Sequence, residues 1–218
     1  MKFAPGRSAA WILVAALAGG AVLSGCAPLA VGGAVLVATD RRTSGAQLED
    51  EGIELRSANR LREALGDRAH INVTSYNRQV LLTGEVPGAA ERQQVEQIVS
   101  RVENVRAIIN DLAVLGNSTL GQRSNDVLIT GKVKASLVDA RDLFANAFKV
   151  VTERGTVYLM GRVTQREADR ATEITRSVGG VQKVVRVMEI ISEEELQRML
   201  PKPAPEPGGS TPPAANRT

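Results

Sequence analysis

Cysteine, histidine and aromatic residues are scarce in this chain of 218 residues. Cys26 is the only cysteine and His70 the only histidine, so the chain can form no internal disulfide and no metal site built from several cysteine and histidine ligands. A cysteine nucleophile needs a histidine or a cationic neighbour in a folded pocket, which the sequence around Cys26 does not offer. We expect His70 to be a surface loop residue, and we expect no metal site, no cofactor and no catalytic residue.

A surplus of positive charge is also missing. The chain has 27 basic and 24 acidic residues, and 25 basic residues remain when Lys2 and Arg7 are removed with the leader. The aromatic residues outside the leader are few and scattered: Tyr76, Phe144, Phe148 and Tyr158. Proteins that bind nucleic acids show a basic excess and aromatic stacking platforms. The composition therefore argues against nucleic acid as a partner.

The most apolar run near the N-terminus is short. Residues 11–23 (WILVAALAGGAVL) follow the basic Lys2 and Arg7 and precede the small residues Ser24 and Gly25. A transmembrane helix needs about 20 apolar residues, and a shorter run with these flanks is the layout of a secretory signal. We predict that residues 1–25 are a signal peptide that the mature protein lacks.

Two further segments lack the pattern of a folded domain. Residues 26–49 begin apolar and turn polar at Asp40, which predicts a tether that can lie against a bilayer surface. Residues 201–218 hold six of the nine prolines and no large apolar residue, which predicts a disordered tail. Just before the tail, residues 192–200 favour a short helix that Ser192 caps and Pro201 ends.

The middle of the chain contains one unit twice, at a spacing of about 76 residues. INVTSYNRQVLLTGEV at 71–86 aligns with FKVVTERGTVYLMGRV at 148–163, which places Gly84 opposite Gly161. Each copy reads as a helix (57–65 or 126–138), two strands around a tight turn, a second amphipathic helix, and a third strand (105–114 or 181–191).

This order predicts an α+β fold with two tandem αββαβ domains. Each would hold a three-stranded mixed sheet with both helices on one face. We place the domains at 50–115 and 124–191, joined by a linker at 116–123. Units of about 65 residues are marginally stable alone, so we expect the two copies to pack on each other.

Two motifs carry a resemblance to a known family. Leu23-Ser24-Gly25-Cys26 resembles the bacterial lipobox, which implies acyl chains on Cys26. An alternating strand, Gly-x-Val, a Glu before an apolar helix, and Gly-Val-x-x-Val resemble the BON domain, a bacterial module associated with phospholipid surfaces. The lipobox followed by two such copies is similar to the division- and outer-membrane-stress-associated lipid-binding lipoproteins. With Ala27 after the cysteine, the resemblance implies a place on the outer membrane, facing the periplasm, with anionic phospholipid and envelope or division proteins as partners.

The second copy is the better candidate for an anionic surface. Residues 50–115 carry eight basic and ten acidic side chains, whereas residues 124–192 carry eleven and eight. In its first helix, Ile129, Val133 and Leu137 share the stripe expected to pack on the sheet. The candidate lipid-binding residues point the other way: Val127, Leu128, Gly131, Lys132, Lys134 and Ala135.

Other interpretations of this helix remain open from the sequence. Val127 and Leu128 could belong to a frayed helix start or pack on the first copy. Asp139 lies near the same face and opposes an anionic surface. The resemblance implies that this helix contacts phospholipid, although the family often has an aromatic residue at the position of Leu128.

Three classes of function therefore compete. A non-enzymatic lipid-binding lipoprotein that supports outer-membrane integrity leads, and a protein-protein adaptor of the cell envelope with incidental lipid contact is the alternative. An enzyme is the weakest, since the sequence shows no catalytic triad, phosphate-binding loop or metal-ligand motif.

Overall fold

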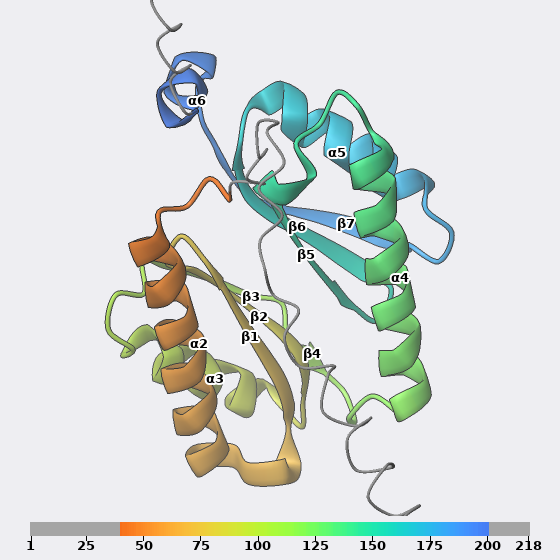
Figure 1. Cartoon of the computed structure of the whole chain (residues 1–218). Coiled ribbons are helices and arrows are strands. Elements are labelled where there is room, and N and C mark those ends of the chain that lie inside the picture. The colour runs from red at the N-terminus through yellow and green to blue at the C-terminus, as the bar shows by residue number, and fades with distance from the viewer. Residues whose placement is uncertain (1–39, 201–218) are drawn as a thin grey trace, which may run out of the picture. The chain divides into compact units, whose positions relative to one another are not determined.

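A computed structural model describes residues 40–200, which form two domains with the same order of elements (Figure 1). The elements of the first domain are α2 Ser44–Leu65, β1 His70–Tyr76, β2 Gln79–Val86, α3 Ala89–Ser100, β3 Ala107–Asn110 and β4 Ala113–Val114. Those of the second are α4 Leu120–Asp139, β5 Phe148–Glu153, β6 Thr156–Val163, α5 Gln165–Ser177 and β7 Lys183–Ile190. Short 3-10 turns precede β1 (Gly66–Arg68) and β5 (Ala145–Ala147), and a short helix, α6 Glu193–Met199, follows β7. The predicted signal peptide 1–25, Cys26, most of the predicted tether and the predicted tail 201–218 lie outside the described residues.

Each domain builds a mixed sheet from a hairpin and a crossover helix. β1 and β5 pair antiparallel with β2 and β6, and β3, β4 and β7 pair parallel with the same central strands. The two hairpin turns, Asn77–Arg78 and Arg154–Gly155, have positive φ at both positions, as the type I′ turn requires. The predicted α+β fold is confirmed.

The third strand of the first domain is interrupted, which differs from the single strand expected at 105–114. β3 ends at Asn110 and β4 begins at Ala113. Between them, the side-chain Oδ1 of Asn110 accepts a hydrogen bond from the backbone N–H of Leu112 at 3.3 Å. This local bond competes with a strand partner, so the ladder breaks there.

Both helices of a domain cover the same face of its sheet, as predicted (Figure 1). In the first domain they bury a core that includes Ile53, Leu61, Val80, Leu82, Val95 and Val99. In the second the core includes Ile129, Val133, Leu137, Val157, Leu159 and Ala171. Residues 40–200 thus hold a hydrophobic core for each domain.

The opposite faces of the two sheets pack against each other. A third apolar cluster joins them, formed by Tyr76, Leu81, Tyr158, Met160 and Val187. At its margin Tyr158 Oη donates to Asp111 Oδ2 at 2.7 Å, and Lys149 Nζ donates to Glu54 Oε1 at 2.8 Å. The central strands β2 and β6 are consequently buried on both faces, and almost every residue of the two strands is buried.

The first helix of each domain begins earlier than the sequence predicted. α2 begins at Ser44 rather than near Ser57, capped by the hydroxyl of Thr43. Two buried positions of α2 are polar, Asp50 and Ser57, so its apolar stripe is hidden in the sequence. The tether predicted at 26–49 is therefore wrong at its C-terminal end, where residues from Ser44 are helical.

α4 likewise begins at Leu120 rather than Asp126. Thr119 and Gln122 form a reciprocal capping box at its start. The linker predicted at 116–123 is too long for the same reason, because its last four residues are helical.

A buried aspartate on the first helix of each domain holds the hairpin turn of that domain. The Asp50 carboxylate accepts from the backbone N–H groups of Asn77 and Arg78, each at 2.7 Å. The Asp126 carboxylate accepts from the N–H groups of Arg154 at 2.7 Å and Gly155 at 2.8 Å. The same aspartate–turn interaction thus occurs in both domains. The sequence did not predict it, although the two aspartates are 76 positions apart, as the repeat requires.

The start of the described chain is fixed to both domains by two arginines. Arg41 makes two hydrogen bonds of 2.7 Å to the buried carboxylate of Glu167 in the second domain. Arg42 Nη1 donates to Asp50 Oδ2 in the first domain at 2.7 Å, and its guanidinium lies 4.4 Å from the ring centroid of Tyr76. Residues 40–42 are therefore part of the folded unit and not of a flexible tether.

Stability is expected to fall in acid because of these carboxylates. Burial by itself would raise the pKa of Asp50 and of Glu167, but their hydrogen bonds outweigh it and hold both pKa values below the usual range. Their contribution is thus complete above the unfolded-state pKa values and is lost as the pH falls through the lower folded-state values. Burial raises the pKa of Glu153, which gives a slope of opposite sign.

We expect the free energy of unfolding of a soluble chain of residues 27–218 to drop by roughly 2–4 kcal/mol between about pH 6 and pH 3. Urea unfolding at a series of pH values measures it. Asp50→Asn should be less stable at pH 6 and lose less on acidification. A wild-type stability that does not change over this range would contradict the assigned ion pairs.

Candidate functional site

The helix α4 has one face in the core and one in solvent. Its buried residues are Asp126, Ile129, Val133 and Leu137, and they fall three or four positions apart. The three apolar residues pack in the second core, while Asp126 holds the β5–β6 turn. Because this inner face is fixed in the core, the other side chains of α4 point toward solvent.

Four long apolar side chains lie exposed on the outer face of α4. Leu120, Val127, Leu128 and Val138 expose 80%, 70%, 63% and 68% of their surface. At 100° per residue, Leu120, Val127 and Val138 lie within about 20° of one another around the helix. Together with the small exposed residues Gly131 and Ala135, these four residues are called the α4 strip from here on.

The structure places all six sequence-predicted residues of this helix in solvent. Val127, Leu128, Gly131 and Ala135 lie in the α4 strip, and Lys132 and Lys134 flank it. Leu120 was not among the predicted residues, because apolar periodicity placed the start of this helix at Asp126. A fraying start is excluded for Val127 and Leu128, since α4 begins at Leu120.

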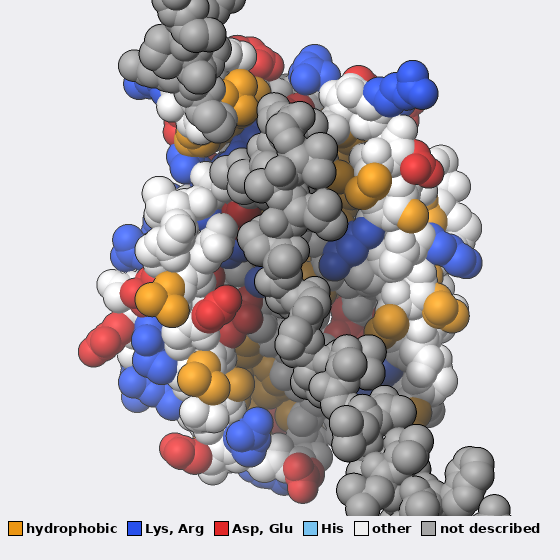
Figure 2. All heavy atoms as spheres, viewed as in Figure 1, with side chains coloured by type: hydrophobic (Ala, Val, Ile, Leu, Met, Phe, Trp, Pro, Cys, Tyr) orange, Lys and Arg blue, Asp and Glu red, His pale blue; other side chains and the backbone are white. Residues whose placement is uncertain are grey.

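Figure 2 shows separate apolar side chains along α4 with basic side chains between them. Lys132 and Lys134 are both exposed, as is Asp139 at the C-terminal end. The other carboxylate of α4, Asp126, is buried and bound to backbone N–H groups. The accessible charge beside the α4 strip is therefore mostly positive.

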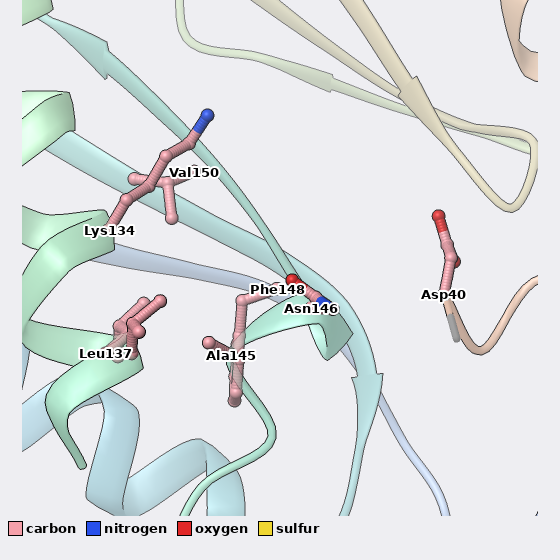
Figure 3. A pocket seen from close by; sticks show the side chains of 8 residues that line it. Asp40, Lys134, Leu137, Ala145, Asn146, Phe148 and Val150 are labelled. Carbon is pink, nitrogen blue, oxygen red and sulfur yellow. The ribbon is translucent and has the colours of Figure 1, made fainter. Parts of the chain in front are cut away.

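The start of the described chain and the α4 strip border the same hollow. A cavity of about 430 Å³ is lined by Asp40, Lys134, Leu137, Val138, Ala145, Asn146, Phe148 and Val150. In Figure 3 the side chains of Lys134 and Leu137 project from α4, and Asp40 lies across the hollow on another segment. Asp40, the first residue that the structure describes, therefore lies across this hollow from α4.

His70 is not the loop residue that the sequence predicted. It is the first residue of β1, and its Nδ1 lies 3.0 Å from Oε2 of the fully buried Glu85. The two residues are cross-strand partners in the β1–β2 hairpin. The aligned repeat begins at Ile71, so His70 fell just outside the predicted strand.

Within residues 40–200, each helix is too short or too polar to cross a membrane.

Both repeats match one protein family. Residues 49–116 and 125–192 each match the BON domain, so fold and sequence define a protein with two tandem BON domains.

The chain is 36% identical over 175 residues to the outer membrane lipoprotein DolP of Haemophilus influenzae, and the aligned region covers 78% of this chain and 90% of that protein. It is 35% identical over 154 residues to the 21 kDa hemolysin of Actinobacillus pleuropneumoniae, covering 70% of this chain and 79% of the relative. The osmotically-inducible protein Y of Escherichia coli shares 29% identity over 117 residues, with 52% and 58% coverage. The chain belongs to the BON-domain family of DolP-like outer membrane lipoproteins.

Proposed function

We propose that this protein is a non-enzymatic lipoprotein that contacts anionic phospholipid through the α4 strip. Acyl chains on Cys26 hold it on the outer membrane, facing the periplasm, and the lipid contact supports the integrity of that membrane, including at division sites. The observation that carries the proposal is the α4 strip itself. It exposes long apolar residues beside lysines on a helix face that the core does not use.

The size of this contact suits selection of a membrane site better than anchoring. A leucine or valine side chain that is fully buried contributes about 1.5–3 kcal/mol, and a helix lying on a bilayer buries such side chains only in part. Each lysine near an anionic surface adds about 1 kcal/mol. Several acyl chains contribute far more, at about 0.8 kcal/mol per buried CH₂. The lipid chains therefore anchor, and the α4 strip chooses the lipid.

The path of the chain supports this division. Asp40 lies fourteen positions after Cys26 in the chain. Fully extended, this segment reaches at most about 50 Å, so the second domain stays near the membrane surface. Asp40 lines the same hollow as Lys134 and Val138 of α4. An anchor this close in sequence to Asp40 keeps the α4 strip within reach of the bilayer.

An adaptor function is the second candidate, and an observation on the first domain favours it. Leu48 and Leu55 are exposed on α2, seven positions apart, and so lie on one side of the helix. An envelope or division protein with an apolar groove could dock there. In this case lipid contact by α4 would be incidental.

Vesicle binding separates the two candidates, with Leu128→Glu as the decisive variant. A chain of residues 27–218 contains both hydrophobic cores and lacks the acylated cysteine. We expect it to co-sediment with vesicles that contain anionic phospholipid and much less with neutral ones. Leu128→Glu should weaken binding to the anionic vesicles at least roughly tenfold. It removes a leucine that is buried in the bilayer on binding, and it adds a negative charge that the anionic lipids repel.

Leu55→Glu is the matched control, since Leu55 exposes 64% of its surface and Leu128 63%. It makes the same substitution on the other domain and should change vesicle binding by less than about twofold. Equal losses in both variants would contradict a specific role for α4. Absence of binding by the wild-type chain to either vesicle would favour the adaptor.

A further inference from the structure

A histidine and two buried carboxylates meet where the two domains face each other. His70 and Glu85 are cross-strand partners on β1 and β2 of the first domain. Glu153 is the last residue of β5 in the second domain. Residues 70 and 153 are far apart in sequence, so only the packing of one sheet on the other brings these groups together.

The three side chains present their ligand atoms at short range. One nitrogen of His70 and one oxygen from each of Glu85 and Glu153 lie within 4.8 Å of one another. The Glu85 side chain is 0% exposed, and Glu153 is buried as well. Two carboxylates this close in a buried place repel each other, so the arrangement needs a positive partner.

The partners within the described chain leave one oxygen unsatisfied. Oε1 of Glu85 is buried and has no hydrogen-bond partner among residues 40–200. The nearest cation is the Arg154 guanidinium, whose Nη1 lies 3.8 Å away and whose side chain is 39% exposed. A buried carboxylate oxygen without a hydrogen bond is costly, which marks it as a position for a missing ligand.

Fixed donors orient both carboxylates toward the cluster. The backbone N–H of Ser118 donates to Glu85 Oε2 at 3.1 Å, and Asn72 Nδ2 donates to Glu153 Oε2 at 2.8 Å. Such outer-shell hydrogen bonds are typical of metal sites, where they hold each ligand in place. The other carboxylate nearby, Asp126, already accepts two backbone N–H groups and is not needed as a ligand.

An ion also needs a path and room for water. A cavity of about 310 Å³ reaches the cluster, and it is lined by His70, Asn72, Arg123, Asp126, Val127, Thr130, Thr152 and Glu153. Its volume accommodates a metal-bound water as a fourth ligand.

We propose that His70, Glu85 and Glu153 bind a Zn²⁺ ion that bridges the two domains. One imidazole nitrogen and two carboxylate oxygens with a water make a four-coordinate set that zinc accepts. Ligand bonds of about 2.1 Å place tetrahedral ligand atoms roughly 3.4 Å apart, so two ligand atoms approach each other by at most about 1.4 Å. Arg154 turns outward into solvent, and Zn²⁺ takes its place beside Glu85. Ca²⁺ and Mg²⁺ prefer sets made only of oxygen and should bind poorly.

The sequence predicted no metal site, because its single cysteine and single histidine cannot form a cluster of such ligands. Two of the three ligands are instead glutamates from separate domains. No spacing within either repeat marks them.

Zinc titration of residues 27–218 tests the proposal, since this chain has no cysteine to bind the metal elsewhere. Isothermal calorimetry should show one Zn²⁺ per chain and no comparable binding of Ca²⁺ or Mg²⁺. With free Zn²⁺ at about a hundred times Kd, we expect Tm to rise by roughly 5–10 °C. Zn²⁺ should also slow the hydrogen exchange of backbone amides at the start of β1 in the first domain and at the end of β5 in the second.

His70→Ala should weaken Zn²⁺ binding at least roughly tenfold, and Glu153→Gln should do the same. Glu173→Gln, which alters an exposed glutamate of the second domain, should leave Kd unchanged. Circular dichroism of the metal-free variants shows whether each is folded. A wild-type chain that takes up no Zn²⁺ would overturn the proposal, as would binding that survives in folded His70→Ala and Glu153→Gln.

Discussion

A chain that cannot be acylated at Cys26 is expected to leave the membrane. When residues 1–26 are replaced by a signal peptide that is cleaved without lipid attachment, the mature chain begins at Ala27 and keeps both domains. Even one 14-carbon acyl chain binds a bilayer only marginally, whereas several hold a protein almost permanently. The share of protein in the membrane fraction should therefore fall from nearly all to a small remainder that the α4 strip alone retains.

Cell fractionation with immunoblotting measures this change, and mass spectrometry of the wild-type chain checks for acyl chains on Cys26. Adding Leu128→Glu to the released chain should remove most of the remainder. A released chain that stays fully on the membrane would show that the folded domains anchor the protein themselves. An unmodified Cys26 in the wild type would contradict the lipobox interpretation.

Gly84→Ala is expected to be among the most destabilising single substitutions in either domain. Gly84 has φ +108°, and a Cβ atom there would lie 2.0 Å from the backbone oxygen of His70. Both the strained backbone and the clash with a neighbouring strand add to the cost, since neither atom can move without breaking the β1–β2 ladder. We expect a loss of roughly 2–5 kcal/mol, measured as a lower urea midpoint for residues 27–218.

Two other glycines serve as comparisons for this substitution. Gly161→Ala, at the equivalent position of the second repeat, should cost less, since its Cβ would lie 2.4 Å from the oxygen of Ala147 without the positive φ. Gly131→Ala should stabilise by about 0.5–1 kcal/mol, because Gly131 lies inside α4 with nothing within 4 Å. An unchanged midpoint for Gly84→Ala would show that the hairpin can shift to admit a methyl group.

The repeat made the fold predictable. A tight turn between two alternating strands, a glycine at the end of the second strand and an apolar stripe on the helix after it occur twice, and each is a local pattern. The outward direction of Val127 and Leu128 was also predictable, because Ile129, Val133 and Leu137 fix the inner face of the helix.

The starts of the two long helices were not predictable from apolar periodicity. In α2 the buried side includes Asp50 and Ser57, which break the stripe. Their polar groups are tolerated because Asp50 binds the N–H groups of a turn more than 25 residues later. Apolar periodicity takes no account of such a distant partner. The predicted helices therefore began too late, where the clear apolar pattern starts.

The sequence by itself predicted a signal peptide and a lipobox, and it determined that the chain holds two copies of one αββαβ domain. Those features depend on residues close together in the chain, so the periodicity of apolar residues and the spacing of motifs are enough to predict them. Only the tertiary structure decided how the two sheets face each other, that Arg41 fixes the start of the folded unit to Glu167, and that His70 and Glu85 meet Glu153. These contacts join residues roughly 70 to 130 positions apart, and they exist because both sheets bury their second face in one shared apolar cluster.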